Sequence, residues 1–241
     1  MLAGHVYYLP LSPLFFLILV AAALALIVLI QIRILTYAFH RLGVSSGAAI
    51  LLLVGSLIGS YINIPVFRLP DEQVLSAREV LFYGMMYVVP VVRDAPGTTI
   101  AVNVGGAVIP ALLSLYLLAK NDLWVRGAIA TAIVAVVCHM VAQPVPGVGI
   151  AEPIFTPPIA SAVVSLVLSR RYAAPLAYVS GSLGALIGAD LANLDKIQGL
   201  GAPVASIGGA GTYDGIFVTG VLAVLIASLS GAAPIARGSR A

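Results

Sequence analysis

The chain has 241 residues, of which 61% are hydrophobic and only 9% are charged, and its mean hydropathy is +1.11. Soluble domains carry about a quarter charged residues, so the composition excludes a soluble globular protein and predicts one integral membrane domain over residues 1–241. The net charge of +3 does not indicate nucleic-acid binding, because the basic residues lie in short segments beside apolar runs. The single cysteine, Cys138, excludes an internal disulfide.

Apolar segments predict an all-α polytopic fold with about seven transmembrane helices. The first segment has no charge before Arg33 and is long enough to cross a hydrocarbon core of about 30 Å. Because 24 glycines and 15 prolines are scattered through these segments, broken or re-entrant helices are expected, above all in the Pro/Gly-rich stretch 144–149. The expected spans are residues 13–34, 46–65, 101–119, 127–142, 157–168, 173–189 and 214–229.

Residues 66–100 differ from the rest, because they hold seven charged side chains around an apolar run that is rich in β-branched and aromatic residues. The turn residues 94–97 separate this run, 80–92, from the β-branched stretch 98–102. This pattern predicts an extracytoplasmic β-hairpin with its turn at 94–97. An amphipathic helix lying in the membrane interface is the competing interpretation.

The charges also predict an orientation in a prokaryotic inner membrane, with the N-terminus extracytoplasmic and the C-terminus cytoplasmic. Basic residues favour the cytoplasmic side of a membrane protein. With seven spans, one side holds a single acid, Asp122, and eight basic residues: Arg33, Arg41, Lys120, Arg126, Arg170, Arg171, Arg237 and Arg240. The other side then holds the remaining eight acids.

This topology brings polar residues together at the extracytoplasmic ends of the helices. Asp190 and Asp214 are the candidate catalytic residues, because each borders an apolar run, where a charge is costly and usually functional. The candidate binding residues are Asn103, Gly105, Gly106, His139, Glu152, Asn193 and Tyr213. Simpler explanations exist: a polar residue marks a helix end, Asp214 favours a helix N-terminus, His139 bonds between helices, and Glu152 is a loop charge.

The segments GADLANL at 188–194 and GGAGTYDGIF at 208–217 resemble a prokaryotic membrane-protein family called domain of unknown function 1614. The resemblance covers nearly the whole chain and implies no known activity. A fainter similarity is to intramembrane aspartyl proteases of the presenilin and prepilin-peptidase type, which place one Asp on a helix and a second in a Gly-x-Gly-Asp motif. Here Thr212 and Tyr213 separate Gly211 from Asp214.

Two classes of function fit these residues. As a hydrolase, Asp190 and Asp214 would share one proton and activate water against a peptide bond. As an ion-coupled transporter, the same residues would bind a proton or cation between broken helices. A metal site of His139, Glu152, Asp190 and Asp214 would fit either class and would suit a hard cation. No organic cofactor is expected, and the expected partners are membrane lipids with a membrane peptide or a small ion as substrate.

Overall fold

The computed structural model describes residues 13–82, 85–95, 97–145, 149–198, 200, 202–209 and 215–229. The chain divides into two compact units, Met1–Tyr37 and Ala38–Ala241. Helix α1 (Pro13–Arg41) begins in the first unit and ends in the second. The predicted helix over 13–34 is therefore confirmed, and it continues to Arg41.

In the first unit, α1 exposes apolar side chains along its length. Leu17, Leu24 and Leu29 each expose more than half of their surface. A helix rises about 1.5 Å per residue, so the 29 residues of α1 exceed the thickness of a hydrocarbon core. This exposed apolar surface is what a helix in contact with lipid presents.

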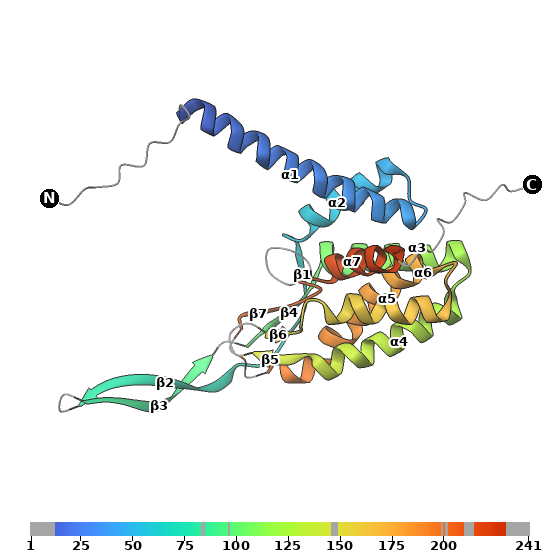
Figure 1. Ribbon diagram of the computed structural model, residues 1–241. Helices are drawn as coiled ribbons and strands as arrows, with labels where there is room; N and C mark the ends of the chain where they lie inside the picture. Colours follow the sequence, from blue (N-terminus) through green and yellow to red (C-terminus); the bar gives the residue numbers. More distant parts are fainter. Residues whose placement is uncertain are drawn as a thin grey trace, which may run out of the picture. The chain divides into compact units, whose positions relative to one another are not determined.

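The second unit is a helix bundle with β-strands at one end (Figure 1). In its described residues, the helices that follow α1 lie close to the predicted spans. They are α2 (Ser46–Gly59), α3 (Ile109–Asn121) with the π-helical segment η1 (Val104–Val108) before it, α4 (Trp124–Val141), α5 (Thr156–Leu168), α6 (Ala173–Ala185) and α7 (Gly215–Leu229).

Helix α6 is the centre of this bundle, because it packs against α3, α4, α5 and α7. Twelve of its thirteen residues are buried, and most of them are small. At its C-terminal end, a Cβ on Gly188 would collide with the carbonyl oxygen of Ala135 in α4. Small residues let membrane helices approach closely, and such contacts replace the hydrophobic effect that drives packing in water.

The last turn of α1, which belongs to the second unit, packs against α7. The Phe39 and Phe217 rings lie 6.2 Å apart between their centroids. The Arg41 Nε donates a hydrogen bond of 3.1 Å to the Ser228 hydroxyl. Arg41 is thereby buried while its charge stays hydrogen-bonded, as a buried charge requires.

The main sheet has the strand order β1-β4-β7. Its strands are β1 (Asn63–Arg68), β4 (Thr99–Asn103) and β7 (Val204–Ile207), with β1 antiparallel and β7 parallel to β4. A separate pair of short strands, β5 (Gln143–Val145) and β6 (Gly149–Ala151), replaces the re-entrant segment predicted at 144–149. The end of the predicted second span, near Pro65, and the start of the third, at Ala101, are accordingly strand and not helix.

A β-hairpin is present, but its turn is not at 94–97. Strand β2 (Glu72–Phe82) pairs with β3 (Met85–Ala95), and β4 pairs with β1 and β7 instead of with β3. The prediction took the residues 94–97 for the tip of the hairpin, whereas Asp94 and Ala95 pair with Gln73 and Glu72 at its base. The pairing of β4 depends on β1 and β7, which are distant in the chain, and a turn pattern does not reveal such partners.

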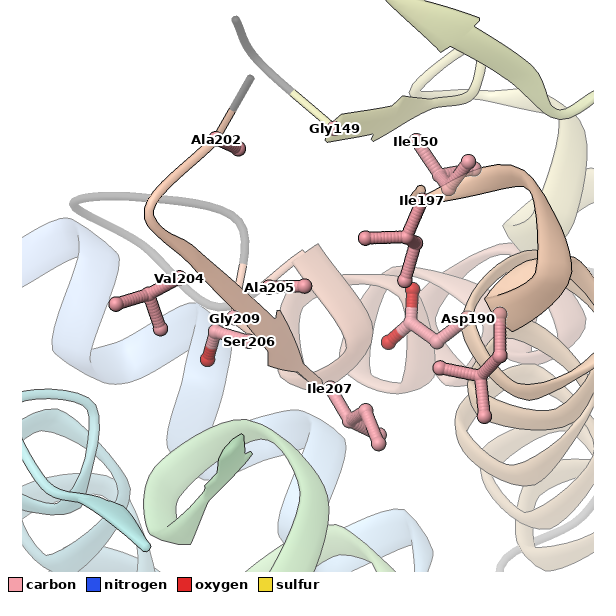
Figure 2. A pocket seen from close by; sticks show the side chains of 11 residues that line it. Gly149, Ile150, Asp190, Ile197, Ala202, Val204, Ala205, Ser206, Ile207 and Gly209 are labelled. Atoms are coloured by element: carbon pink, nitrogen blue, oxygen red, sulfur yellow. The ribbon is translucent and has the colours of Figure 1, made fainter. Parts of the chain in front are cut away.

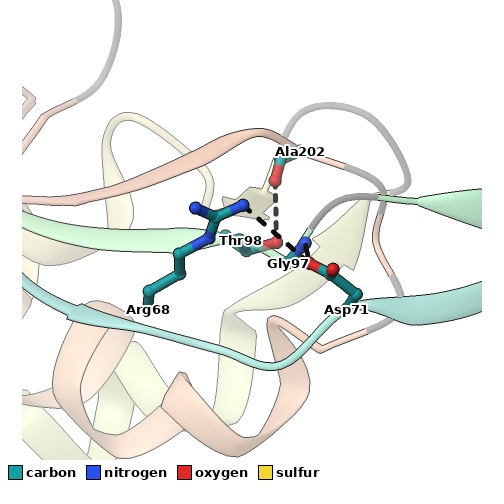
Figure 3. Close-up of polar contacts among 5 residues, drawn as sticks. All are labelled: Arg68, Asp71, Gly97, Thr98 and Ala202. Carbon is teal, nitrogen blue, oxygen red and sulfur yellow. Dashed lines mark hydrogen bonds and ion pairs between the residues drawn. The ribbon is translucent and has the colours of Figure 1, made fainter.

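Side-chain contacts hold the base of the hairpin to the main sheet (Figure 3). The Asp71 carboxylate accepts a 2.7 Å hydrogen bond from the Gly97 N–H and lies 3.9 Å from Arg68. The buried Thr98 hydroxyl donates a 2.7 Å bond to the carbonyl of Ala202, just before β7. The ion pair is exposed and contributes little, so the two hydrogen bonds are the main polar link.

Among the described residues after α1, three helical segments are long and apolar enough to cross a membrane: Val104–Asn121, Trp124–Val141 and Ala173–Lys196. The number rises to four if Val28–Arg41 and Ser46–Gly59 count as one bent span. In the described residues, α5 and α7 are apolar but shorter than a usual span. The structure thus shows a mostly helical membrane protein, and the count of seven spans stays a prediction.

The close approach of α6 to α4 predicts that Gly188→Ala destabilises the protein. The added methyl group would meet the main chain of Ala135, which cannot move aside as a side chain could. We expect a loss of about 1–3 kcal/mol, as for overpacked cores, measured as a lower melting temperature in detergent. In the matched control Gly47→Ala, the methyl group meets nothing within 4 Å, and helix propensity should raise stability slightly. Equal melting temperatures for the two variants would contradict this account of the packing.

Candidate functional site

Asp190 stands at the point where α6 loses its regular geometry. The helix passes into the π-helical segment η2 (Leu186–Asp190) and then into the 3₁₀-helical segment η3 (Leu191–Lys196). Segments of π-helix are rare and are often found at functional sites. The Asp190 carboxylate is half-buried, and its Oδ2 accepts a 2.6 Å hydrogen bond from the Gly208 N–H.

Gly208 can make this bond because it occupies a position that only glycine fits. Its φ of +83° is left-handed, and a Cβ would lie 2.7 Å from both the N and the Cβ of Ala107 in η1. The turn after β7 therefore packs closely against η1. This packing orients the Gly208 N–H toward the Asp190 carboxylate. Gly208, the first residue of the segment 208–217, thus positions a main-chain hydrogen-bond donor for Asp190.

A cavity of about 240 Å³ opens beside Asp190 (Figure 2). Its walls come from three parts of the chain: Gly149 and Ile150 in β6, the segment from Asp190 to Ile197, and residues 202–209 including β7. Apart from the Asp190 carboxylate and the Ser206 hydroxyl, the side chains that line it are apolar. The cavity therefore combines apolar walls with a charged group, as small binding sites commonly do.

Glu152 follows β6 and is the second carboxylate of this region. Burial, and next the negative charge of Asp190, raise the pKa of Glu152 to about 7, and a hydrogen bond with the Cys138 thiol opposes this rise. Its Oε2 is buried and has no hydrogen-bond partner among the described residues. Near neutral pH, Glu152 is therefore a carboxyl group that gains and loses a proton beside Asp190.

Asn193 has a structural role, because its side chain is fully buried and hydrogen-bonded within the chain. Its amide nitrogen donates 2.9 Å bonds to the carbonyls of Gly188 and Ala189, and its oxygen accepts a 2.7 Å bond from Lys196. These bonds satisfy carbonyl groups that the irregular helix end leaves open. Asn193 thus supports the position of Asp190.

Asn103, Gly105 and Gly106 also have structural contacts. The Asn103 side chain donates to Ser60 O at 2.8 Å and accepts a 2.9 Å bond from the Gly106 N–H, which caps η1. Gly105 is packed against α2, where a Cβ on Gly59 would lie 2.8 Å from its nitrogen. The two glycines permit this close backbone approach, which joins α2 to η1.

The remaining predicted site residues are not brought together with Asp190 and Glu152. His139 is exposed on α4, whereas its neighbour Cys138 is buried. Tyr213 and Asp214 lie outside the described residues, so the predicted Asp190–Asp214 pair stays a prediction. In the described part of the chain, no three His, Cys, Asp or Glu side chains form a group that could hold a metal ion.

Two contributors to this region were not predicted from the sequence, namely the Gly208 N–H and the Cys138 thiol. A main-chain donor has no signal in a sequence beyond a glycine-rich turn. In the sequence, Cys138 is not distinguished from the apolar residues around it in α4. In the structure it belongs to a buried cluster with Val134, Ala185 and Ala189. The contact of its thiol with Glu152 depends on the fold of β5 and β6.

The apolar helices and the carboxylate-lined cavity at one end of them define an integral membrane protein with a polar site. The chain belongs to the family described as "Protein of unknown function (DUF1614)", whose model matches residues 57–226. No curated protein and no solved structure matches the chain. The family resemblance is thereby confirmed, and the fainter similarity to intramembrane aspartyl proteases receives no support.

The pKa of Glu152 predicts how stability depends on pH. The folded protein holds this proton up to about pH 7, whereas an unfolded chain releases it near pH 4.3. The free energy of unfolding should therefore decrease as pH rises from about 5 to 7, by at most about 1.4 kcal/mol per pH unit from this group. Melting temperatures across this range should show the decrease in the wild type, and Glu152→Gln should make it smaller. The variant Asp195→Asn, which changes an exposed acid, should keep the wild-type profile, and an unchanged profile in Glu152→Gln would contradict the assignment.

Proposed function

We propose that the protein is a membrane-embedded hydrolase in which Asp190 and Glu152 act as a carboxylate pair on an amide bond. The observation that carries this proposal is the second carboxyl group, Glu152, which senses the charge of Asp190 beside an otherwise apolar cavity. Two carboxyl groups at close range do not both stay ionised, so the pair retains one proton near neutral pH. One group is then an acid while the other is a base.

The arrangement assigns a role to each group. The Asp190 carboxylate, oriented by the Gly208 N–H, takes a proton from a water molecule, and the water oxygen bonds to the carbonyl carbon of the substrate. Glu152, whose free Oε2 carries the shared proton, gives it to the leaving nitrogen as the C–N bond breaks. Positioned acids and bases of this kind contribute about 10²–10⁴-fold each. The reaction consumes one water molecule and needs no redox partner.

Asp214 remains the predicted alternative partner of Asp190. Ile216, near the start of α7, belongs to the same buried cluster as Ala185 and Ala189 of the segment that carries Asp190. The variants below separate Asp214 from Glu152 as the source of the acid.

Proton-coupled transport is the second candidate, and the irregular end of α6 favours it. Discontinuous helices at a site with a titrating carboxyl group are a feature of secondary transporters, and α6 is followed at Asp190 by the irregular segments η2 and η3. Such a protein would carry a proton on Glu152 without breaking a covalent bond. Hydrolysis and transport are therefore distinguished by whether water oxygen enters a product.

The hydrolase proposal predicts that Asp190→Asn and Glu152→Gln each reduce amide cleavage at least a hundredfold, because each removes one partner of the pair. The assay uses the full chain in liposomes, a pool of quenched fluorogenic peptides and ¹⁸O-labelled water, and mass spectrometry should find one ¹⁸O in each new carboxyl group. Asp195→Asn, the matched exposed-acid variant, should retain the wild-type rate.

Three outcomes would change this assignment. Activity that persists in Glu152→Gln but is lost in Asp214→Asn would give the acid role to Asp214. Cleavage without ¹⁸O in the product, or undiminished in Asp190→Asn, would end the hydrolase proposal. Proton flux into the liposomes that Asp190→Asn abolishes, with no cleavage at all, would favour transport.

We also propose that the strand-bearing end of the bundle faces the extracytoplasmic side. The strands lie at this end, whereas the α3–α4 and α5–α6 connections lie at the other (Figure 1). Basic residues stand in or beside these connections: Lys120 near the end of α3, Arg126 near the start of α4, and Arg170 and Arg171 between α5 and α6. Basic residues favour the cytoplasm. Seven spans would then place the loop between α1 and α2 on the cytoplasmic side.

Cysteine labelling tests this topology in a Cys138→Ala background. A cysteine at Asp71 should react with an impermeant maleimide in intact cells, because the hairpin base is expected outside. Cysteines at Ser45 and Asp122 should react only after the membrane is permeabilised. Labelling of position 45 from outside would show that α1 and α2 form one bent span, and labelling of position 71 only after permeabilisation would reverse the orientation.

A further inference from the structure

Strand β7 is an edge strand whose open side can be identified residue by residue. It ends the strand order β1-β4-β7, so β4 covers only one of its sides in the described residues. Toward β4, the Thr99 N–H donates a 3.0 Å bond to the Pro203 carbonyl. Because both main-chain groups of a residue in a parallel ladder point to the same side and alternate along the strand, residues 203, 205 and 207 face β4. Val204 and Ser206 therefore direct their main-chain groups to the open side, where the Ser206 carbonyl already accepts a 3.0 Å bond from the Gly209 N–H.

The hydrogen bond from the Gly208 N–H to Asp190 shows how a main-chain donor on the open side of β7 is paired. Gly208 continues this alternation, and its N–H points away from β4 to the Asp190 carboxylate. Asp190 Oδ2 thus takes the place that a carbonyl oxygen of a neighbouring strand would occupy. A chain extended along β7 would reach this carboxylate at its end and bring a main-chain amide beside it.

The cavity of about 240 Å³ is the space that such a chain would enter. It is lined by Val204–Ile207 on one side and by Ile150 and Ile197 on the other (Figure 2). Val204 is the exposed residue of β7, with 49% of its surface accessible, whereas residues 205–207 are half-buried. The Asp190 carboxylate, which lines this space, disfavours acidic side chains there, and the small size of the cavity favours small apolar ones.

We propose that β7 binds an extended peptide segment by strand addition and places one of its amide bonds at Asp190, the segment being uncharged or basic with small apolar side chains. This inference rests on the proposed function and names its substrate class. Main-chain hydrogen bonds to an edge strand supply affinity that does not depend on a particular sequence. The peptide needs free N–H groups on alternate residues, because only those residues face β7.

Backbone N-methylation tests the strand geometry. The probe is a capped, fluorescent hexapeptide of alternating valine and alanine, titrated by fluorescence polarisation against the full chain in detergent. Two analogues carry N-methyl groups on the odd or on the even residues. One analogue should bind at least tenfold more weakly than the parent, and the other should bind within about threefold. The proposal would be overturned if both analogues bound equally or if the parent peptide did not bind at 1 mM. Displacement of the peptide by a fatty acid alone would also overturn it and would mark a site for lipid chains.

A variant pair tests the strand itself and separates this proposal from the hydrolase proposal. Val204→Pro removes an N–H from the open side without touching the bonds to β4, and should weaken peptide binding at least tenfold, whereas Val204→Thr keeps the N–H and the branched shape and should bind normally. Asp190→Asn should bind the peptide and not cleave it. Bound but uncleaved peptide in the wild type would refute hydrolysis and leave strand addition standing. Cleavage that Asp190→Asn abolishes and Val204→Pro leaves unchanged would refute strand addition alone.

Discussion

The burial of α6 on all sides is the constraint on which the second unit depends. A helix that contacts four others in a membrane gains little from the hydrophobic effect between helices, so its stability comes from close packing and from hydrogen bonds inside the bundle. Small side chains meet that requirement, and Gly188 shows how little space remains, since even a methyl group would strike the main chain of α4. A helix fixed this tightly can carry an irregular end, and Asp190 stands in that end with its position set by the helix, by Asn193 and by Gly208.

Among the described residues, the buried polar groups at the strand-bearing end of the bundle are of two kinds, those with hydrogen-bond partners within the chain and one without. The one without such a partner marks the candidate site. Asn103 and Asn193 are buried, and the hydrogen bonds of their side chains are made within the chain. Glu152 has a buried oxygen with no partner in the described residues, an arrangement that costs about 1–3 kcal/mol and is uncommon without a function. A buried carboxyl group whose pKa lies near 7 is less costly in its protonated form. The protonation of Glu152 therefore affects both the free energy of unfolding and the proton that this side chain can exchange.

The sequence predicted the helices well, because each depends on a local apolar run: α4 was expected at 127–142 and is found at Trp124–Val141, and α5 was expected at 157–168 and is found at Thr156–Leu168. It predicted the pairing of strands poorly, because the partners of β4 lie in β1 and β7, far along the chain in both directions. Asp190 and Glu152 were both selected from the sequence, but only the fold shows that Glu152 is the carboxylate whose proton responds to Asp190. Asn103 was predicted to bind a ligand, and the structure shows that it caps η1. A polar residue at a helix end fits both roles, so the binding role stays a prediction.

The parallel pairing of β4 with β7 also has a consequence for how the protein is made. Thr99 pairs with Val204, so the connection between the two strands contains α3, α4, α5 and α6. Contacts between such distant residues form late, because the intervening chain must first be ordered. During synthesis, β7 leaves the ribosome after those helices have entered the membrane, and the Gly208 donor follows it. Until nearly all of the protein has been translated, a nascent chain therefore contains Asp190 without the strand that completes the cavity beside it.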